Sequence, residues 1–538
     1  MSDIESNHRR FFWSDALHIP ISRSSCLLLI AFGVGVILLL SSDFGSSWDI
    51  TVHEGAGAKA YQFYFQGFDS LEFKRDNPSV YYGVLTNVKI KLVQDLTSNP
   101  LQKFEIRVFL QALITFSCLI PTFLICARVV PNGLALIGAA LLASTPVFFG
   151  HAFINPKDSL AASGVVWCLW LVLYCFANRD RPRYGAIIVL GLLLGVTTSL
   201  RYIAGYLLLL VPLIALFLSA QPQWHSTPHF FWRVGHQAGL EVRGLALLIL
   251  CFVSAYTLSM PSILADFAAQ SYLAVMHSFA HAGWSGSILY FGHYVEAQHL
   301  PWHYVYGYLF VQLPLYFHFF LLFFLALCAA RPARLREVVS GLNTSERTTL
   351  FALAVSVFLP LLLIFVVRPV FYDGFRHVLF LVPLILMLLY LSFVLALNAF
   401  GSITQKLVVA MAILCWMQAL LAMRDLHPYE YAYYNPLVSP AGEFELDYWA
   451  SSFRELAGEL NDYARRQVPR GEKLRLAVCG PTPPLTLFLD HDKFELVSEG
   501  QAQLMVSLNR DKCMSFFRGP WLFSIERKNL VFSLVARP

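Results

Sequence analysis

The chain has 538 residues, of which 57% are hydrophobic and only 14% charged, whereas roughly 25% of the residues of an ordinary soluble domain are charged. This composition indicates a multi-pass membrane protein. The net charge of +5 is small for this length and the basic residues are scattered in short loops, which excludes the clustered basic surface of a nucleic-acid-binding protein.

Eleven apolar segments approach the length of about 20 residues that an α-helix needs to cross a bilayer. The first follows a basic stretch and has no small-residue cleavage site after it, so a retained anchor is predicted. The fifth and sixth form one apolar block, which we divide at Arg201. The predicted crossings are 25–41, 107–127, 132–150, 159–177, 185–200, 203–220, 243–262, 305–328, 348–367, 377–397 and 406–423.

Basic residues in the loops predict the orientation of these crossings. With the N-terminus in the cytoplasm, the inside loops carry Lys or Arg in turn, as the positive-inside rule requires. These residues are Arg128, Arg179, Arg181, Arg183, Arg233, Arg243, Arg331, Arg334, Arg336 and Lys406. An odd number of crossings places the C-terminal tail outside, in the periplasm if the membrane is a bacterial inner membrane. The outer face then also holds residues 42–106, 151–158, 201, 263–304 and 368–376.

Two kinds of structure are predicted outside the crossings. In the first outer loop, ITVHEGAGAKAYQFYFQ and SVYYGVLTNVKIKLVQDL have the spacing of amphipathic helices that lie in the membrane interface. In the tail, WASSFRELAGELNDYARR predicts a helix, and KLRLAVCG, KFELVSEG, AQLMVSLNR, WLFSIER and LVFSLVA predict short strands. We therefore expect an all-α membrane domain over 1–435 and a small α/β domain over 436–538. Cys479 and Cys513 lie in this tail and could form a disulfide in an oxidising compartment.

Candidate acidic residues occur where the outer loops meet the membrane. Asp49 follows Trp48 at the outer end of the first crossing, where partial desolvation would raise its pKa toward the range of a general base. The alternative is an exposed loop acid. Asp158, in the turn after Lys157, could be the N-cap of the fourth crossing, but its place on the same face as Asp49 favours a shared site. Glu54 has the weaker case, since it could simply cap or face the interfacial helix.

Cationic residues on the same face predict a phosphate site. Arg201 lies between two apolar helices, and Arg368, Arg376 and His377 occur together in VVRPVFYDGFRHVLF. Charges at the ends of membrane helices are costly unless they snorkel, pair or line a polar cavity. Guanidinium groups offer paired donors to phosphate oxygens. Snorkelling of the side chain toward water explains one arginine at a helix end well. It explains three arginines on the same face less well.

A further patch, YFGHYVEAQHLPWHYVYGY, carries His293, Glu296, His299 and His303 among aromatic residues. Its histidine spacing matches no zinc signature, so an aromatic interfacial belt or a sugar-stacking surface is favoured over a metal site. No Walker A, G-x-G-x-x-G or G-x-S-x-G motif occurs in a strand-to-helix context, so nucleotide chemistry and serine hydrolysis lack support. No cofactor is predicted, and a divalent cation is not expected.

Six motifs follow one another along the chain. They are WDITVHEGAGAKAYQFYF with VYYGVL, GHAFINPKDSLAA, LRYIAGYLLL, LPWHYVYGY, VFYDGFRHVLFLVP and HPYEYAYYNPLVSPAGEFELDYWASSFRELA. Together they resemble the GT-C membrane glycosyltransferases, in particular the bacterial family similar to protein O-mannosyltransferases and to the aminoarabinose transferase of lipid A. The resemblance covers most of the chain. It implies inverting transfer of a sugar from a polyprenyl phosphate to an acceptor hydroxyl or phosphate at the outer face.

The resemblance also implies roles for single residues. The catalytic Asp of that family lies in the first outer loop, usually as Asp-Glu, eight residues before a Gly that opens the interfacial helix. Asp49 and Gly57 keep this spacing, although Ile50 replaces the usual Glu, and Asp158 matches an acidic residue that helps to hold the acceptor or the base. The predicted phosphate-binding residues are Arg201, Arg376, His377, Lys157 and Arg368. The predicted sugar- or acceptor-binding residues are Glu54, His53, Tyr82, Trp302, His303 and Tyr372.

The expected partners are a polyprenyl-phosphate-linked sugar and a lipid, glycan or protein acceptor. The main alternative is a transporter or flippase of a lipid-linked glycan. Transporters place ionisable groups at the midplane of broken helices and show two related halves, whereas here the charges collect on one face and the halves look unlike. A noncatalytic scaffold that presents the C-terminal domain is a further alternative.

Overall fold

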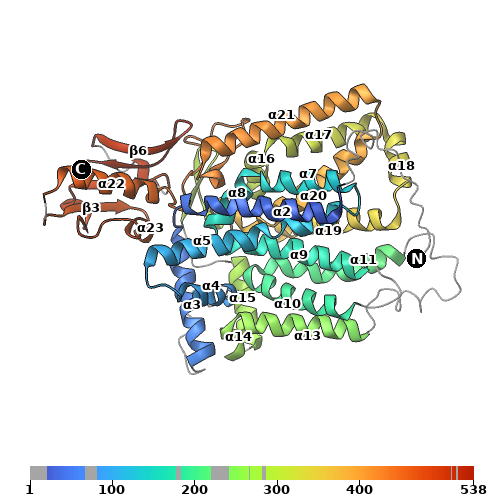
Figure 1. Cartoon of the computed structure of the whole chain (residues 1–538), viewed down its shortest axis with the longest axis horizontal. Helices are drawn as coiled ribbons and strands as arrows, with labels where there is room; N and C mark the ends of the chain where they lie inside the picture. The colour runs from blue at the N-terminus through green and yellow to red at the C-terminus, as the bar shows by residue number, and fades with distance from the viewer. Residues whose placement is uncertain are drawn as a thin grey trace.

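The computed structural model describes residues 21–66, 82–176, 183–219, 242–265, 267–280, 286–469, 471–510, 512–515 and 519–538. Helices form an elongated bundle, and the C-terminal sheet lies at one end of it, next to α3 (Figure 1). The basic positions 179, 181 and 233, which support the predicted orientation, lie outside the described residues.

Long and short apolar helices make up the bundle. They are α2 (Arg23–Leu38), α5 (Pro100–Phe116), α6 (Leu119–Cys126), α7 (Asn132–Ala143), α8 (Pro146–Ile154), α9 (Asp158–Phe176), α10 (Tyr184–Leu200), α11 (Leu207–Ser219), α13 (Val242–Ser259), α16 (Tyr304–Gln312), α17 (Leu315–Ala330), α19 (Thr344–Val367), α20 (Leu381–Leu397) and α21 (Ser402–Leu426). Shorter helices α14 (Pro261–Ala265), α15 (Phe267–Ala280) and α18 (Pro332–Ser340) connect them.

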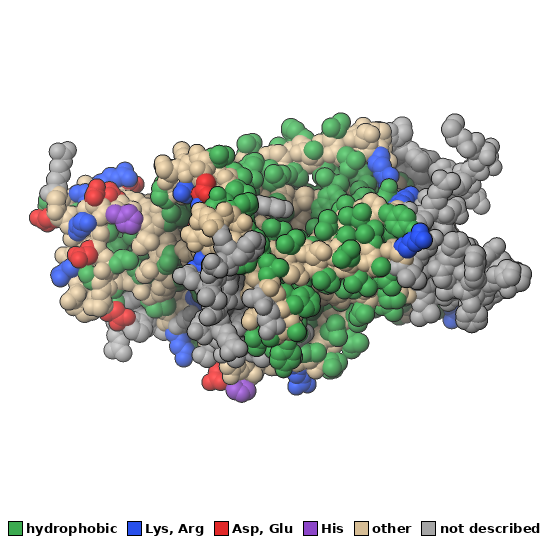
Figure 2. Space-filling model, turned by 90° about the horizontal axis from the view of Figure 1, so that it is seen from below, with side chains coloured by type: hydrophobic (Ala, Val, Ile, Leu, Met, Phe, Trp, Pro, Cys, Tyr) green, Lys and Arg blue, Asp and Glu red, His purple; other side chains and the backbone are tan. Residues whose placement is uncertain are grey.

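Five helical segments of the described chain are long and apolar enough to cross a membrane, and seven if each bent pair is one span. The bent pairs are α7 with α8, at 61°, and α16 with α17, at 106°. Both bends fall at a proline, Pro146 or Pro314, where a helix cannot continue its hydrogen bonds. On the face shown in Figure 2, hydrophobic side chains cover much of the middle, and the visible charged side chains lie toward the ends and along the lower edge. The other predicted crossings coincide with shorter apolar helices. The helices support an integral membrane protein, but the count of eleven crossings and their orientation stay predictions.

Both helices predicted for the first outer loop are present, and their place in the membrane interface stays a prediction. They are α3 (Trp48–Gln66) and α4 (Leu85–Gln94). However, α3 begins at Trp48, so Gly57 lies in its middle and does not open it. A Cβ atom at Gly57 would lie 2.9 Å from the Cβ of Asn87 in α4, which explains the glycine: the two helices pack too closely for a side chain there. Asp49 consequently lies in the first turn of α3.

The C-terminal part forms the predicted helix and five strands. These elements are α22 (Phe453–Gln467), β3 (Leu474–Cys479), α23 (Pro483–Thr486), β4 (Phe494–Leu496), β5 (Leu504–Leu508), β6 (Trp521–Arg527) and β7 (Leu530–Ala536). The strand order is β4-β3-β5-β7-β6, in which β4, β3 and β5 are parallel and β7 is antiparallel to both neighbours. Lys528 and Asn529 join β6 to β7 with positive φ angles, as a tight hairpin with the sheet's twist requires. The boundary of this domain at residue 436 stays a prediction.

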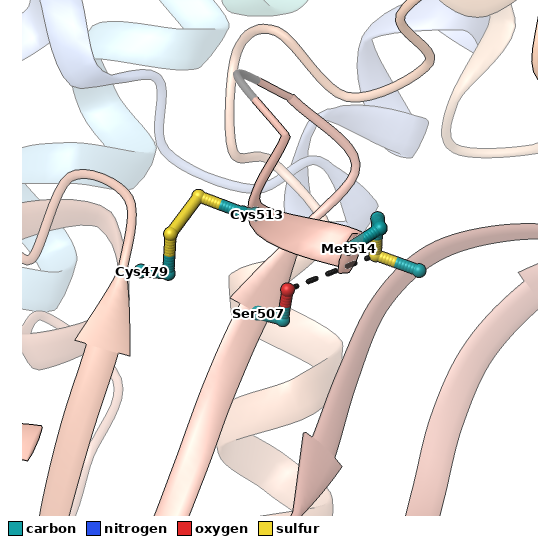
Figure 3. Close-up of a disulfide and its surroundings, with 4 residues drawn as sticks. All are labelled: Cys479, Ser507, Cys513 and Met514. Carbon is teal, nitrogen blue, oxygen red and sulfur yellow. Dashed lines mark hydrogen bonds between the residues drawn. A yellow bond between two sulfur atoms is a disulfide. The ribbon is translucent and has the colours of Figure 1, made fainter. Parts of the chain in front are cut away.

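A disulfide joins Cys479 at the end of β3 to Cys513 (Figure 3). It ties the end of β3 to the short helical turn after β5, 34 residues away in sequence. This pairing agrees with the expectation that the tail faces an oxidising compartment.

One hairpin in the membrane part was not predicted. β1 (Ser287–Tyr290) pairs with β2 (His293–Glu296), and Phe291 and Gly292 form the turn with positive φ angles. The hairpin falls inside the aromatic and histidine-rich patch, whose alternation is too short to be distinguished from an irregular loop.

Candidate active site

Segments from distant parts of the chain meet at the end of the bundle that adjoins the C-terminal sheet. The start of α3 is fixed there by two contacts. The Trp48 N–H donates to the Trp449 carbonyl at 3.3 Å, and the Ser47 hydroxyl donates to the carbonyl of Ile154, the last residue of α8, at 2.9 Å. The Asp49 side chain is held in this corner, and 19% of it is exposed.

Arg376 lies at the centre of a buried cluster of charges. Its Nη1 atom donates to Asp49 Oδ2 at 3.1 Å and is 4.0 Å from Asp158 Oδ2, while its Nη2 atom is 3.0 Å from Asp373 Oδ2. The guanidinium also lies over the rings of Tyr372 and Trp449, at 4.7 and 4.5 Å from their centroids. Only 1% of the Arg376 side chain is exposed, so these partners fix its position.

Asp158 forms the second half of the cluster. Its Oδ1 atom accepts a hydrogen bond from Arg201, and its Oδ2 atom accepts one from Asn155 Nδ2 at 3.0 Å. The backbone N–H groups of Lys157 and Asp158 donate to Asn155 Oδ1, at 3.2 and 2.9 Å. Asn155 therefore caps the start of α9, the alternative role predicted for Asp158. The Asp158 carboxylate pairs with cations instead. Arg201 lies in the extended break after α10, as predicted, and η4 (Tyr202–Tyr206) begins behind it.

The electrostatics of this corner differ from the expectation for Asp49. Burial alone raises the pKa of Asp49, but the charges of Arg376, His53 and Lys157 and the hydrogen bond from Arg376 lower it more, so the net pKa lies below its ordinary value of 3.8. The expectation of a raised pKa is wrong because it considered burial without the cations. Burial, together with Lys157, lowers the pKa of His53 to about 3. Burial and the nearby Arg201 hold the pKa of Lys157 well below its usual range.

Five other predicted residues lie beside the charges. The ammonium group of Lys157 lies 3.4 Å from the centroid of the Tyr82 ring. The ring of Tyr372, which stacks on Arg376, meets the buried His377 edge to face at 4.6 Å. His53 is buried below Asp49 on α3, where its Nδ1 atom is 3.5 Å from Asn87 Nδ2.

The structure does not bring all predicted residues to this cluster. Glu54 points to the other side of α3, where it accepts a hydrogen bond from Gln94 at 3.0 Å and lines an open cavity of about 550 Å³ between α3, α5 and α23. Five residues separate it from Asp49, which places it about 140° away around the helix. Glu54 instead faces Arg107, at 3.9 Å.

Trp302, His303 and Arg368 also lie apart from the charges. His303 Nδ1 pairs with the Tyr290 hydroxyl at 2.9 Å, and the half-exposed Trp302 packs against Phe365, so both belong to the surface around the β1–β2 hairpin. Arg368 ends α19 in a left-handed conformation and is exposed. Among the described residues, no ion pair links Arg368 to the cluster.

Sequence reasoning missed three members of the cluster. Asp373 lies in the motif VFYDGFRHVLFLVP, but no role was predicted for it. It has a φ of 54° and precedes Gly374, a pattern that could have marked it as a fixed turn residue. Trp449 also lay in a quoted motif without a role. Arg510 follows β5 without any local pattern that distinguishes it.

No group of three or more His, Cys, Asp or Glu side chains that could hold a metal ion occurs within the described ranges. The chemistry available here is that of carboxylates, guanidinium groups and aromatic rings. Such a cluster can accept a proton and bind an anion.

Comparison with solved structures gives several similar chains. ArnT from Cupriavidus metallidurans bound to undecaprenyl phosphate is 12% identical, with a TM-score of 0.47 over 96% of this chain and 98% of that chain. The apo oligosaccharyltransferase of Archaeoglobus fulgidus is also 12% identical, with a TM-score of 0.46 over 90% of this chain and 65% of that chain. Among curated proteins, none matches the sequence of this chain.

A family comparison matches one continuous part of the sequence. Residues 85–238 fit the family described as dolichyl-phosphate-mannose-protein mannosyltransferase. The matched part contains Asp158 and Arg201, while Asp49, Arg376 and the C-terminal sheet lie outside it. This match confirms, for residues 85–238, the resemblance to protein O-mannosyltransferases that the sequence motifs indicate.

Proposed function

We propose that this protein is an inverting glycosyltransferase that moves a sugar from a polyprenyl phosphate to an acceptor at the outer face of the membrane. The observation that carries the proposal is the meeting of Asp49, Asp158, Arg201 and Arg376 in one buried corner. These residues come from four distant segments, and apolar helices lie beside them. A lipid-linked phosphate needs this combination of cations and an adjoining apolar wall.

Asp49 is the general base of the proposed reaction. Its carboxylate takes the proton of the acceptor hydroxyl while the acceptor oxygen forms a bond to the anomeric carbon of the sugar. The bond from that carbon to the phosphate oxygen breaks, and its electron pair leaves with the polyprenyl phosphate. Attack opposite to the leaving group inverts the configuration at the anomeric carbon.

Arg201 and Arg376 receive the phosphate. Both guanidinium groups are bound to carboxylates, Arg376 with 1% and Arg201 with 13% of its side chain exposed, and they keep their charge at every physiological pH. Lys157 contributes less charge, because burial and Arg201 lower its pKa. His377 and Tyr82 complete the wall beside the phosphate, Tyr372 is a candidate to contact the sugar, and Asp158 orients Arg201.

The decisive experiment replaces Asp49 by Asn in the full chain. We expect sugar transfer from labelled polyprenyl-phosphate mannose, the sugar named by the matched family, to membrane acceptors to fall by about 10² to 10⁴-fold, because only the general base is lost. Binding of the labelled donor should be nearly retained. The control is Asp95→Asn, which makes the same chemical change at the exposed acid just after α4, which pairs with Lys91. Transfer by Asp49→Asn at the parent rate would show that Asp49 is not the base.

The same donor also separates a transferase from a flippase. In sealed vesicles with labelled donor and an acceptor extract, a transferase moves the label from lipid to acceptor, and this transfer is lost in Asp49→Asn. A flippase would move intact donor between leaflets without breaking the sugar–phosphate bond. Movement of intact donor without any transfer would contradict the proposal.

A further inference from the structure

We infer that Arg510 of the C-terminal sheet is a positioning residue for the active site, acting on Arg376 through Asp373. This inference rests on the proposed function and adds a contribution from the C-terminal sheet. The C-terminal part then helps to hold the phosphate-binding arginine Arg376 in place, in addition to lying over the site.

The contacts of Arg510 support this role. One guanidinium nitrogen, Nη2, donates to Asp373 Oδ1 at 2.9 Å, and the other, Nη1, donates to the Tyr448 carbonyl at 2.8 Å. The guanidinium also lies 5.0 Å from the centroid of the Trp48 ring, the residue before Asp49. Arg510 is only 8% exposed. Its planar group is therefore held between the sheet, the 448 segment and the start of α3.

Asp373 transmits the position of Arg510 to Arg376. Its Oδ1 atom faces Arg510 and its Oδ2 atom faces Arg376, at 2.9 and 3.0 Å. If Arg510 were absent, this buried acid would lose one of its two arginine contacts. The guanidinium of Arg376 would then be drawn toward Asp373 and away from Asp49, because Arg510 no longer offsets the charge of this buried carboxylate.

The chain offers a matched control for docking of the C-terminal part. Arg454, in α22, donates to the Phe44 carbonyl at 2.9 Å and is 3.8 Å from Glu105 of α5. It joins the same two parts of the molecule as Arg510. Among the described residues, none of its contacts involves a member of the charged cluster.

The test compares Arg510→Met, Arg510→Lys and Arg454→Met in the full chain, with labelled polyprenyl-phosphate mannose as donor. We expect kcat/KM to fall on the order of 100-fold in Arg510→Met, because misplacement of a positioned group by about 1 Å has this effect. Arg510→Lys should lose less, since it keeps the charge but cannot make both bonds. Arg454→Met should transfer at close to the parent rate.

Two readouts distinguish positioning from a general structural role. In Arg510→Met the acid limb of the pH–rate profile should move to higher pH, because Asp49 loses part of its contact with Arg376, and this should not happen in Arg454→Met. The double variant Asp373→Asn, Arg510→Met should lose no more activity than Asp373→Asn alone, since both changes break the same connection. Additive losses would overturn the inference.

The outcomes also separate this inference from the proposed function. If Asp49→Asn is inactive but Arg510→Met keeps the parent rate and pH profile, the positioning role is wrong and the transferase stands. If Asp49→Asn is active, the proposed function itself is wrong. Should Arg510→Met fail to fold, a parent-like rate and profile in Arg510→Lys would equally overturn the positioning role.

Discussion

The buried charges around Arg376 balance one another. Arg201, Arg376 and Arg510 alternate with Asp49, Asp158 and Asp373 through direct contacts, so three cations face three anions. In the proposed reaction the donor phosphate carries one negative charge and the released polyprenyl phosphate carries two at high pH. Asp49 becomes neutral when it takes the acceptor proton. The cluster thus gains one positive charge in the same step in which the phosphate gains a negative one.

The low pKa of Asp49 predicts the pH dependence of transfer. The group is ionised, and able to act as a base, at every pH above its lowered pKa, and it loses this ability only as the pH falls through that value. The rate should therefore show no acid limb between about pH 5 and pH 7 that belongs to Asp49. The measurement is kcat/KM against pH with purified enzyme.

A second variant makes this prediction specific. Arg376 supplies the largest lowering effect on the Asp49 pKa. Arg376→Met should therefore move the acid limb to higher pH and weaken donor binding, while Asp95→Asn should leave the profile unchanged. An unchanged profile in Arg376→Met would mean that Asp49 does not control the acid side of the reaction.

Sequence alone predicted the types of residue in the site better than their environment. Charged residues next to apolar helices are costly unless they pair or line a polar cavity, and this cost pointed to Asp49, Asp158, Arg201 and Arg376. The lowered pKa of Asp49 depends on Arg376, which is 327 residues away in sequence. A pattern of neighbouring residues cannot reveal such a contact. The same limit explains the misplacement of Arg368 and Glu54, which carry suitable groups but face other surfaces.

At the scale of elements, the close contact between α3 and α4 holds the layer below Asp49. Asn87 of α4 lies against Gly57 and reaches both His53, at 3.5 Å, and Arg107, whose Nη2 donates to Asn87 Oδ1 at 2.8 Å. Gly57→Ala would place a methyl group 2.9 Å from the Asn87 Cβ and 3.2 Å from its backbone. The two helices must then separate. We expect a loss of about 1–3 kcal/mol in the free energy of unfolding and reduced transfer.

Gly55 provides the matched control on the same helix. A Cβ atom there meets nothing within 4 Å. Gly55→Ala should leave transfer unchanged and stabilise α3 by up to about 1 kcal/mol, because alanine favours a helix over glycine. Thermal unfolding of both variants in detergent checks the pair. Equal behaviour of the two alanine variants would contradict the packing argument.

Element types were predicted well where the pattern was long or strongly periodic. The strands of the C-terminal sheet and the helix α22 appear as expected, because each carries a clear alternation or amphipathic spacing. The bends at Pro146 and Pro314 were not predicted, although both prolines are visible in the sequence and interrupt the helices. The β1–β2 hairpin was not predicted because its alternation is too short. The start of α3 was also misjudged, because contacts with Trp449 and Ile154 fix it, and these lie far away in sequence.

For the whole molecule, two observations bear on which side of the membrane holds the charged cluster. The Cys479–Cys513 disulfide belongs to the sheet next to the cluster, and disulfides persist in oxidising compartments. At the other end of the bundle, the short connection between α17 and α19 contains α18 with Arg334 and Arg336. Cytoplasmic loops are enriched in such basic residues. Both observations favour an outer-face site.

Two measurements in intact bacterial cells that produce the chain test this orientation. Alkaline phosphatase, which folds only where its own disulfides form, should be active when fused after residue 538 and inactive when fused in the loop at 341–343. A membrane-impermeant maleimide should label Cys479 and Cys513 only after reduction with an impermeant reductant, while the buried Cys26 and Cys118 stay unlabelled and serve as controls. Active phosphatase at 341–343 would place the cluster in the cytoplasm. There a soluble nucleotide sugar could reach it, and the argument for a lipid-linked donor would lose its basis.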